Sequence, residues 1–242
     1  MGTELIHAAA DRDGVDVVTA VNRSETDSVG GVSVADAAQL PSRLAADDPD
    51  VLVDFTGPDS SLEYVAACEE AGVPAVIGTT GFSEAQLNDL REAADQVPLL
   101  RATNFARGVA ALRRAVQEAV AALPDYDIEV TETHHNGKRD APSGTATTLL
   151  STVETERESL ESRTHGREGI QPREDSEVGV HARRAGQITG EHEVLLAGNR
   201  EVLELTHRAG SRGVFAEGAL DAASWLIDQS PGFYEFDDVI DA

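Results

Sequence analysis

The chain has 242 residues, 40% of them apolar, which is enough for the core of one large or two small domains. Its 19 lysines and arginines against 44 aspartates and glutamates give a formal net charge of −25, which excludes a nucleic-acid-binding surface built from clustered cations. The single cysteine, Cys68, excludes an intramolecular disulfide and a cysteine-based zinc site, and the lack of a membrane-length apolar run or a signal-like N-terminus indicates a cytosolic protein without membrane contact.

The first hundred residues alternate between apolar runs typical of buried strands and stretches typical of helices. Strands are predicted at 15–21, 51–55, 74–77 and from 99. Helices are predicted at 3–12, 34–40 with a further piece around 44, 60–71 and 83–95, the last capped by Ser83. Strands alternating with helices at this spacing predict right-handed βαβ units and a parallel sheet.

The pattern changes after residue 105. It predicts a long helix at 109–123, a half-buried strand at 127–133, a helix at 143–158 and a long polar loop at 159–177. Three strand-like runs at 178–182, 192–196 and 202–207 resemble an antiparallel meander, and a final helix is predicted at 212–228. We therefore expect an α/β domain with an inserted mixed or antiparallel α+β domain. The expected boundaries are 1–104 with 211–242, and 105–210.

Lys138 is the only lysine in the chain, and every other strong cation is an arginine. Arginine supplies charge and bidentate salt bridges, but it does not offer a compact ammonium with a transferable proton. Lys138 lies beside His134 and His135, so its retention points to chemistry. The alternative is compositional drift with one chance survivor.

The segment around Lys138 combines three kinds of group. A turn at Asn136-Gly137 can fold Lys138 back towards His134, where its ammonium would disfavour the imidazolium. Residues 142–145, Pro-Ser-Gly-Thr, then open a helix whose N-terminal N–H groups and hydroxyls form an anion site. An acid, a cation and a carboxylate cradle suit a small carboxylated substrate that receives a proton.

Each of these features also has a structural interpretation. A His-His pair at a strand end is more often structural or a weak metal site, although no nearby ligand set completes a zinc site, and Ser143 is also a plausible simple N-cap. Residues 78–81, Gly-Thr-Thr-Gly, follow a strand as a ligand loop or an ordinary turn. The spaced set from Arg184 to His192 is explained equally well by a glycine-shaped hairpin with a solvated arginine.

Taken together, the motifs resemble the 4-hydroxy-tetrahydrodipicolinate reductase (dihydrodipicolinate reductase) family of the diaminopimelate route to lysine. The likeness covers nearly the whole chain, and its most specific part is the segment from Glu132 to Ala146. The other matching segments are 54–56, 76–82, 104–105 and 184–192.

The resemblance implies a Rossmann-type parallel sheet with helices on both faces, and a second domain that binds substrate and builds a homotetramer. It implies hydride transfer from NADPH or NADH to a cyclic dicarboxylate, without a metal. His134 would be the proton donor and Lys138 its cationic partner. The implied substrate-binding residues are His135, Ser143, Gly144 and Thr145. The implied cofactor-binding residues are Asn22, Arg23, Gly78, Thr79, Thr80, Ala102, Thr103, Asn104 and Phe105.

Two features depart from the family pattern. The family begins with a strand and a glycine-rich phosphate-binding loop, whereas Met1-Gly2 matches only the end of that loop. We expect that the coding start is assigned one methionine too late, rather than that the chain is truncated; a chain made as written would bind cofactor poorly. Asn22-Arg23 replaces the acidic residue that favours NADH, so we expect NADPH or dual use.

Two competing functions remain open at this stage. One is a cofactor-deficient paralogue acting as a binding or scaffold subunit, supported by the missing loop alone. The other is a related dehydrogenase of the same fold with another amino-acid-derived substrate. The dispersed acidic surface suggests adaptation to high salt, which a melting series in increasing KCl would test.

Overall fold

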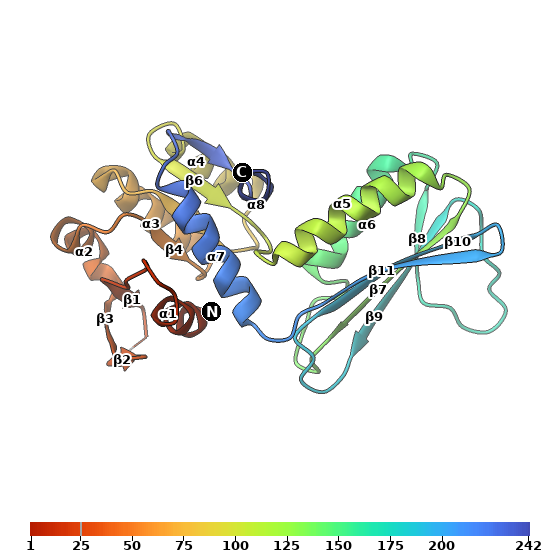
Figure 1. The fold of residues 1–242 in the computed structure, drawn as a ribbon, viewed down its shortest axis with the longest axis horizontal. Coiled ribbons are helices and arrows are strands. Elements are labelled where there is room, and N and C mark those ends of the chain that lie inside the picture. The colour runs from red at the N-terminus through yellow and green to blue at the C-terminus, as the bar shows by residue number, and fades with distance from the viewer. Residues whose placement is uncertain (25) are drawn as a thin grey trace. The chain divides into compact units, whose positions relative to one another are not determined.

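The computed structural model describes residues 1–24 and 26–242. The chain divides into two compact units (Figure 1), Met1–Ala106 with Arg212–Ala242, and Arg107–Ser211. In the part of the chain that the structure describes, no helix is both long and apolar enough to cross a membrane.

The first unit is a parallel sheet with helices. Its elements are α1 (Gly2–Ala10), β1 (Ala20–Asn22), β2 (Ser28–Val29), β3 (Val32–Asp36), η1 (Ala37–Gln39), α2 (Leu40–Asp47), β4 (Leu52–Asp54), α3 (Pro58–Ala71), β5 (Ala75–Ile77), α4 (Glu84–Ala93), β6 (Pro98–Arg101), α7 (Gly213–Leu226), β12 (Gly232–Tyr234) and α8 (Phe236–Ile240). Strands β12, β6, β5 and β4 are neighbours in that order, all parallel, which confirms the predicted parallel sheet.

Local sequence explains the best-formed elements of this sheet. Every residue of β5 is fully buried, as a continuous apolar run between two helices requires. Ser83 caps α4 through a capping box with Gln86, and Gly72 ends α3 in the left-handed conformation at φ 70°. The helix expected at 34–40 is wrong at its start, because Val34–Asp36 belong to β3, which pairs in parallel with β1.

The sheet of this unit is divided into two pieces. Within the described residues, β1 pairs with β3 and β4 pairs with β5, but β1 and β4 do not pair with each other. A cavity of about 580 Å³ is lined by residues of β1 and β4. Val18 and Ile227, which also line it, are 55% and 45% exposed. The strand expected at 15–21 accordingly shortens to Ala20–Asn22, because no described strand pairs with the residues that precede Ala20.

The second unit has one continuous sheet. Its elements are α5 (Arg107–Ala122), β7 (Asp127–His134), α6 (Gly144–Glu156), β8 (Ser162–His165), β9 (Glu177–Arg184), β10 (Glu191–Gly198) and β11 (Glu201–Arg208). The strand order is β11-β10-β7-β9-β8, with β7, β9 and β8 parallel and β10 antiparallel to both of its neighbours. The expected meander is therefore wrong for β9, because β7 lies between β9 and β10.

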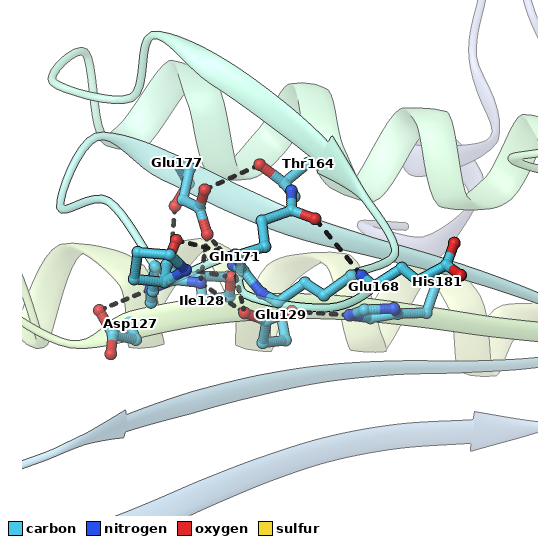
Figure 2. A network of polar contacts seen from close by, with 11 residues as sticks. Asp127, Ile128, Glu129, Thr164, Glu168, Gln171, Glu177 and His181 are labelled. Carbon is cyan, nitrogen blue, oxygen red and sulfur yellow. Dashed lines mark hydrogen bonds and ion pairs between the residues drawn. The ribbon is translucent and has the colours of Figure 1, made fainter.

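A network of charges ties the loop after β8 to this sheet (Figure 2). Arg173 contacts Asp127 at 2.8 Å and also binds Glu129, while Arg167 pairs with the buried Glu177. His181 adds a 2.7 Å contact to Glu129. The segment expected to be only loop thus contains β8 and is held by arginines whose role here is structural.

Candidate active site

His134 lies at the end of β7, where it is 9% exposed. Its Nδ1 is 2.5 Å from Glu132 Oε2, and a Cβ placed on Gly190 would lie 3.1 Å from its Nε2. Glu132 and His134 are two residues apart on one strand, so their side chains share a face of the sheet. The ring is thus held by one nitrogen, and a side chain at Gly190 would crowd the other nitrogen.

Lys138 follows a turn after His134. Its N–H donates to the carbonyl of His135 at 3.1 Å, and the N–H of Asn136 donates to the carbonyl of Gly186 at 3.2 Å. The Lys138 ammonium forms a 2.9 Å ion pair with Asp140. The predicted Asn-Gly turn is therefore present, and Lys138 has a carboxylate partner that the sequence did not suggest.

The start of α6 supplies the third part of the site. Ser143 is buried, its N–H donates to Glu132 at 3.1 Å, and its Oγ accepts the N–H of Ala146 at 3.2 Å. The same Oγ is 3.1 Å from His192 Nε2. Ser143 is therefore the helix N-cap, one of the two roles foreseen for it. Gly144 begins the helix, and space is open where its Cβ would be.

Burial and charge act in opposite directions on His134. Burial lowers the pKa of His134, Glu132 raises it, and Lys138 and Arg184 lower it further, with a net shift downward. Lys138 acts in the direction expected, but burial is the larger cause. Burial raises the pKa of Glu132, but hydrogen bonds from Arg184 and His134 lower it more. At neutral pH the site therefore holds an ionised Glu132 beside a readily deprotonated imidazole.

The residues expected to bind cofactor lie in the first unit, at the carboxyl ends of its strands. Asn22 and Arg23 are exposed at the end of β1, and Thr80 and Thr103 are exposed after β5 and β6. The other residues expected to bind cofactor are wholly or partly buried and make contacts inside the unit. Ala102 is buried, Gly78 is in close contact with the Phe55 ring, and Asn104 accepts the N–H of Ala106 at 2.8 Å.

Phe105 and Thr79 are better explained by packing than by ligand contact. Phe105 is 1% exposed and packs its ring against Phe55 and Phe236. Thr79 donates its hydroxyl at 2.8 Å to Asp54, a buried carboxylate that also binds the Ser61 hydroxyl. Sequence reasoning quoted Asp54 only as part of a motif, whereas here it ties the ends of β4 and β5 to α3.

The donors of the first unit fit the phosphates of a nucleotide. Helix α1 starts at Gly2 without a side-chain cap, which leaves its first N–H groups suited to a phosphate. Gly2, Asn22 and Thr56 line one cavity. Arg23 is not simply available, because it forms a 2.5 Å ion pair with Glu63 of α3. Glu63 was missed because it lies far from Arg23 in the sequence.

Two further residues of the second unit were not assigned roles from the sequence. Arg184 at the end of β9 binds both oxygens of Glu132, at 2.8 and 2.7 Å, and Glu132 is 1% exposed. His192, on β10, stacks edge-on against His134 with ring centroids 5.2 Å apart. The sequence offered one signal for this cluster. Glu132 precedes His134 by two residues in a strand-like run, which places the two side chains on the same face of the sheet.

Comparisons with known proteins agree over the whole chain. Residues 1–105 match the family described as dihydrodipicolinate reductase, N-terminus, and residues 108–240 match its C-terminus. The 4-hydroxy-tetrahydrodipicolinate reductases of Natronomonas pharaonis and Haloarcula marismortui are 56% and 53% identical. The alignments cover 99% and 100% of this chain and 95% of each relative.

A solved structure shows the same fold. Dipicolinate-bound dihydrodipicolinate reductase from Paenisporosarcina sp. TG-14 has a TM-score of 0.80 at 24% identity, covering 97% of this chain and 92% of that one. Diaminopimelate dehydrogenase of C. glutamicum is more distant, with a TM-score of 0.58 at 14% identity over 97% and 89% of the two chains. From the two family matches and the high identity of its relatives, the chain belongs to the dihydrodipicolinate reductase family.

Proposed function

We propose that this chain reduces 4-hydroxy-tetrahydrodipicolinate to tetrahydrodipicolinate with NADPH or NADH, with His134 as proton donor and Lys138 as its cationic partner. The reductase activity follows from membership of the family. The observation that best supports the two roles is the placement of His134, Lys138 and the start of α6 within one unit. An acid, a cation and a helix N-terminus are thereby offered to one small dicarboxylate.

The net reaction takes up a hydride and a proton and releases the 4-hydroxyl group as water. When bound, the nicotinamide supplies the hydride. His134 delivers a proton from Nε2, because its Nδ1 is held by Glu132 at 2.5 Å. The low pKa of His134, caused first by burial, makes the imidazolium a ready donor once substrate carboxylates favour its charged form.

Substrate carboxylates are assigned to the cation and the helix start. Lys138 leaves Asp140 for a substrate carboxylate, and the backbone of Gly144 and Thr145 binds a carboxylate through the N-terminus of α6. His135 adds a hydrogen-bonding ring on the same turn. Ser143 acts through its backbone and as the cap, since its hydroxyl already contacts Ala146 and His192.

In the first unit, the cofactor is assigned to α1 and the strand ends. The first N–H groups of α1 would hold the pyrophosphate, and Asn22 and Arg23 would lie beside the adenosine ribose. The turn at Gly78–Thr80 and the stretch from Ala102 to Phe105 would border the nicotinamide through the exposed Thr80 and Thr103, with Thr79 and Phe105 supporting them from the interior. Use of NADPH, NADH or both remains part of this proposal.

We further propose that the second unit assembles a homotetramer in the cytosol through the open face of its sheet. Ala197 on β10 pairs with Val202 on β11, which is 59% exposed. Leu196, next to Ala197, is buried, so Ala197 and Val202 lie on the opposite face of the sheet. An apolar group on the uncovered side of a sheet favours contact between subunits. Light scattering of the wild type and of Val202→Glu tests this: a wild-type monomer would contradict it.

The enzymatic proposal is tested by following NAD(P)H oxidation with freshly generated 4-hydroxy-tetrahydrodipicolinate. His134→Gln and Lys138→Ala are each expected to lower kcat by about 10²- to 10⁴-fold, the usual contribution of a positioned acid or its partner. His165→Gln is the matched control, because His165 is an exposed histidine of the same unit. An unchanged kcat in either variant would remove that residue from the mechanism.

The same assay separates the competing functions. Binding of substrate without NAD(P)H oxidation by the wild type would favour a cofactor-deficient binding protein. Oxidation only with another amino-acid-derived substrate would favour a related dehydrogenase. Retained circular dichroism and melting temperature in the variants show that lost activity is not lost folding.

A further inference from the structure

We propose that Glu132, clamped by Arg184, is a positioning residue that holds His134 in the tautomer with its proton on Nδ1 and so directs proton delivery through Nε2. Glu132 is 1% exposed, so it acts through His134 rather than on the substrate. The inference rests on the proposed role of His134. It concerns residues to which the sequence assigned no role.

Four hydrogen bonds surround the Glu132 carboxylate. Its Oε1 accepts from the Ser143 N–H at 3.1 Å and from Arg184 Nη2 at 2.7 Å. Its Oε2 accepts from Arg184 Nη1 at 2.8 Å and lies 2.5 Å from His134 Nδ1. The partners come from the start of α6, the end of β9 and β7 itself. A carboxylate held from three elements has no freedom to rotate, and therefore neither does the ring that binds it.

The chemistry of the clamp decides the tautomer. An ionised carboxylate only accepts hydrogen bonds, so the nitrogen beside it must carry the proton. Arg184 and the Ser143 N–H are both donors, and they stabilise the ionised form of Glu132 despite its burial. After Nε2 gives up its proton, the neutral ring keeps Nδ1–H against Glu132. The arrangement resembles the carboxylate–histidine pairs that orient catalytic histidines in other enzymes.

Arg184 also balances the charge of Glu132. The charged or titratable groups around His134 are Glu132 on its own strand, Lys138 and Asp140 on the following turn, Arg184 on β9 and His192 on β10. Glu132 favours the imidazolium, whereas Lys138 and Arg184 disfavour it. Removing Glu132 or Arg184 should therefore move the proton affinity of His134 in opposite directions.

The first test is ¹⁵N NMR of the histidine rings in the free protein, which does not depend on activity. The wild type is expected to show neutral His134 protonated on Nδ1. Glu132→Gln should lose this preference. If the glutamine oxygen accepted from His134 Nδ1, its NH₂ group would point at the donors of Arg184 and Ser143, which would disfavour that orientation. A wild-type His134 protonated on Nε2 would overturn the proposal, even if the variant failed to fold.

The second test is the pH profile of kcat in the reductase assay. Glu132→Gln is expected to lower kcat by about 10- to 100-fold, as for other residues that orient a functional ligand, with KM for NAD(P)H unchanged. As the pH rises, activity that needs protonated His134 should be lost at a lower pH than in the wild type in Glu132→Gln, and at a higher pH in Arg184→Gln. Glu132→Asp should restore part of kcat.

Glu158→Gln is the control, because Glu158 is an exposed carboxylate of the same unit that lies outside its sheet. Equal losses of kcat in Glu158→Gln and Glu132→Gln, or pH profiles that do not move, would contradict a positioning role. If the wild type itself lacked reductase activity, the proposed function would fail, while the NMR measurement would still decide the tautomer.

Discussion

The two units of the chain differ in how completely their sheets are built. In the second unit, five strands form one sheet, and Leu150, Val153 and Ile128 at its core are fully buried. In the first unit the sheet comes in two pieces, and a cavity of about 580 Å³ is lined by β1 and β4. Apolar side chains there, such as Val18, are left half-exposed.

This difference separates two ways of holding a functional group. His134 is fixed by hydrogen bonds that converge on the buried Glu132, and the members of this network all lie in one closed unit. Asn22 and Arg23 lie at the end of β1, which pairs with β3 alone among the residues that the structure describes. We therefore expect the substrate part of the chemistry to be more rigid than the cofactor part.

The largest stability effect should come from matched leucine truncations in the two units. Leu150→Ala in the closed core is expected to cost about 2–5 kcal/mol, because it leaves a cavity in packed surroundings. Leu52→Ala on β4 should cost about 1 kcal/mol, since that side chain already borders open space. Urea unfolding followed by circular dichroism and by Trp225 fluorescence measures both losses of unfolding free energy. Equal losses would contradict the proposed difference between the two units.

The next effect is a pH dependence of stability in the second unit. Burial lowers the pKa of His192 to about 4, below its unfolded value near 6.5. Above pH 6.5 His192 is neutral in both the folded and the unfolded protein, so its protonation does not reduce the free energy of unfolding. As the pH falls the unfolded state binds the proton first, so roughly 3 kcal/mol is lost by pH 4.

His192→Gln should make this part of the stability curve less steep, leaving the smaller contributions of His134 and His207, whose pKa values burial also lowers. The glutamine keeps a polar side chain near Ser143 but does not itself titrate between pH 4 and 6.5. His165→Gln, an exposed histidine of the same unit, should leave the slope as in the wild type. A slope in His192→Gln as steep as in the wild type would show that other groups cause it.

The smallest effect is expected at the cofactor end of the first unit. Arg23 forms its ion pair with Glu63, and both side chains are more than half exposed. Glu63→Gln should raise kcat/KM for NADPH relative to NADH by a few-fold, because Arg23 is released to a 2′-phosphate. Arg23→Ala should lower the same ratio. Ratios that do not change in either variant would exclude this pair from cofactor choice.

The sequence alone predicted most helices and strands, because their signals are local. Ser83 and Gly72 mark helix ends, and the continuous apolar run of β5 marks a buried strand. The segment from His134 to Thr145 could also be recognised as a site, since its residues lie close in the chain. The resemblance to the reductase family rested on that same segment, and the comparisons confirmed the family.

Only the tertiary structure decided the partners of those residues. Arg184 meets Glu132 across neighbouring strands, and His192 reaches Ser143 from a third strand. The place of β7 between β9 and β10 was likewise undetermined, because strand order depends on long-range pairing. Local patterns determine where elements form and which side chains they carry. Pairing between distant segments determines which charges neutralise one another, and so how His134 is held.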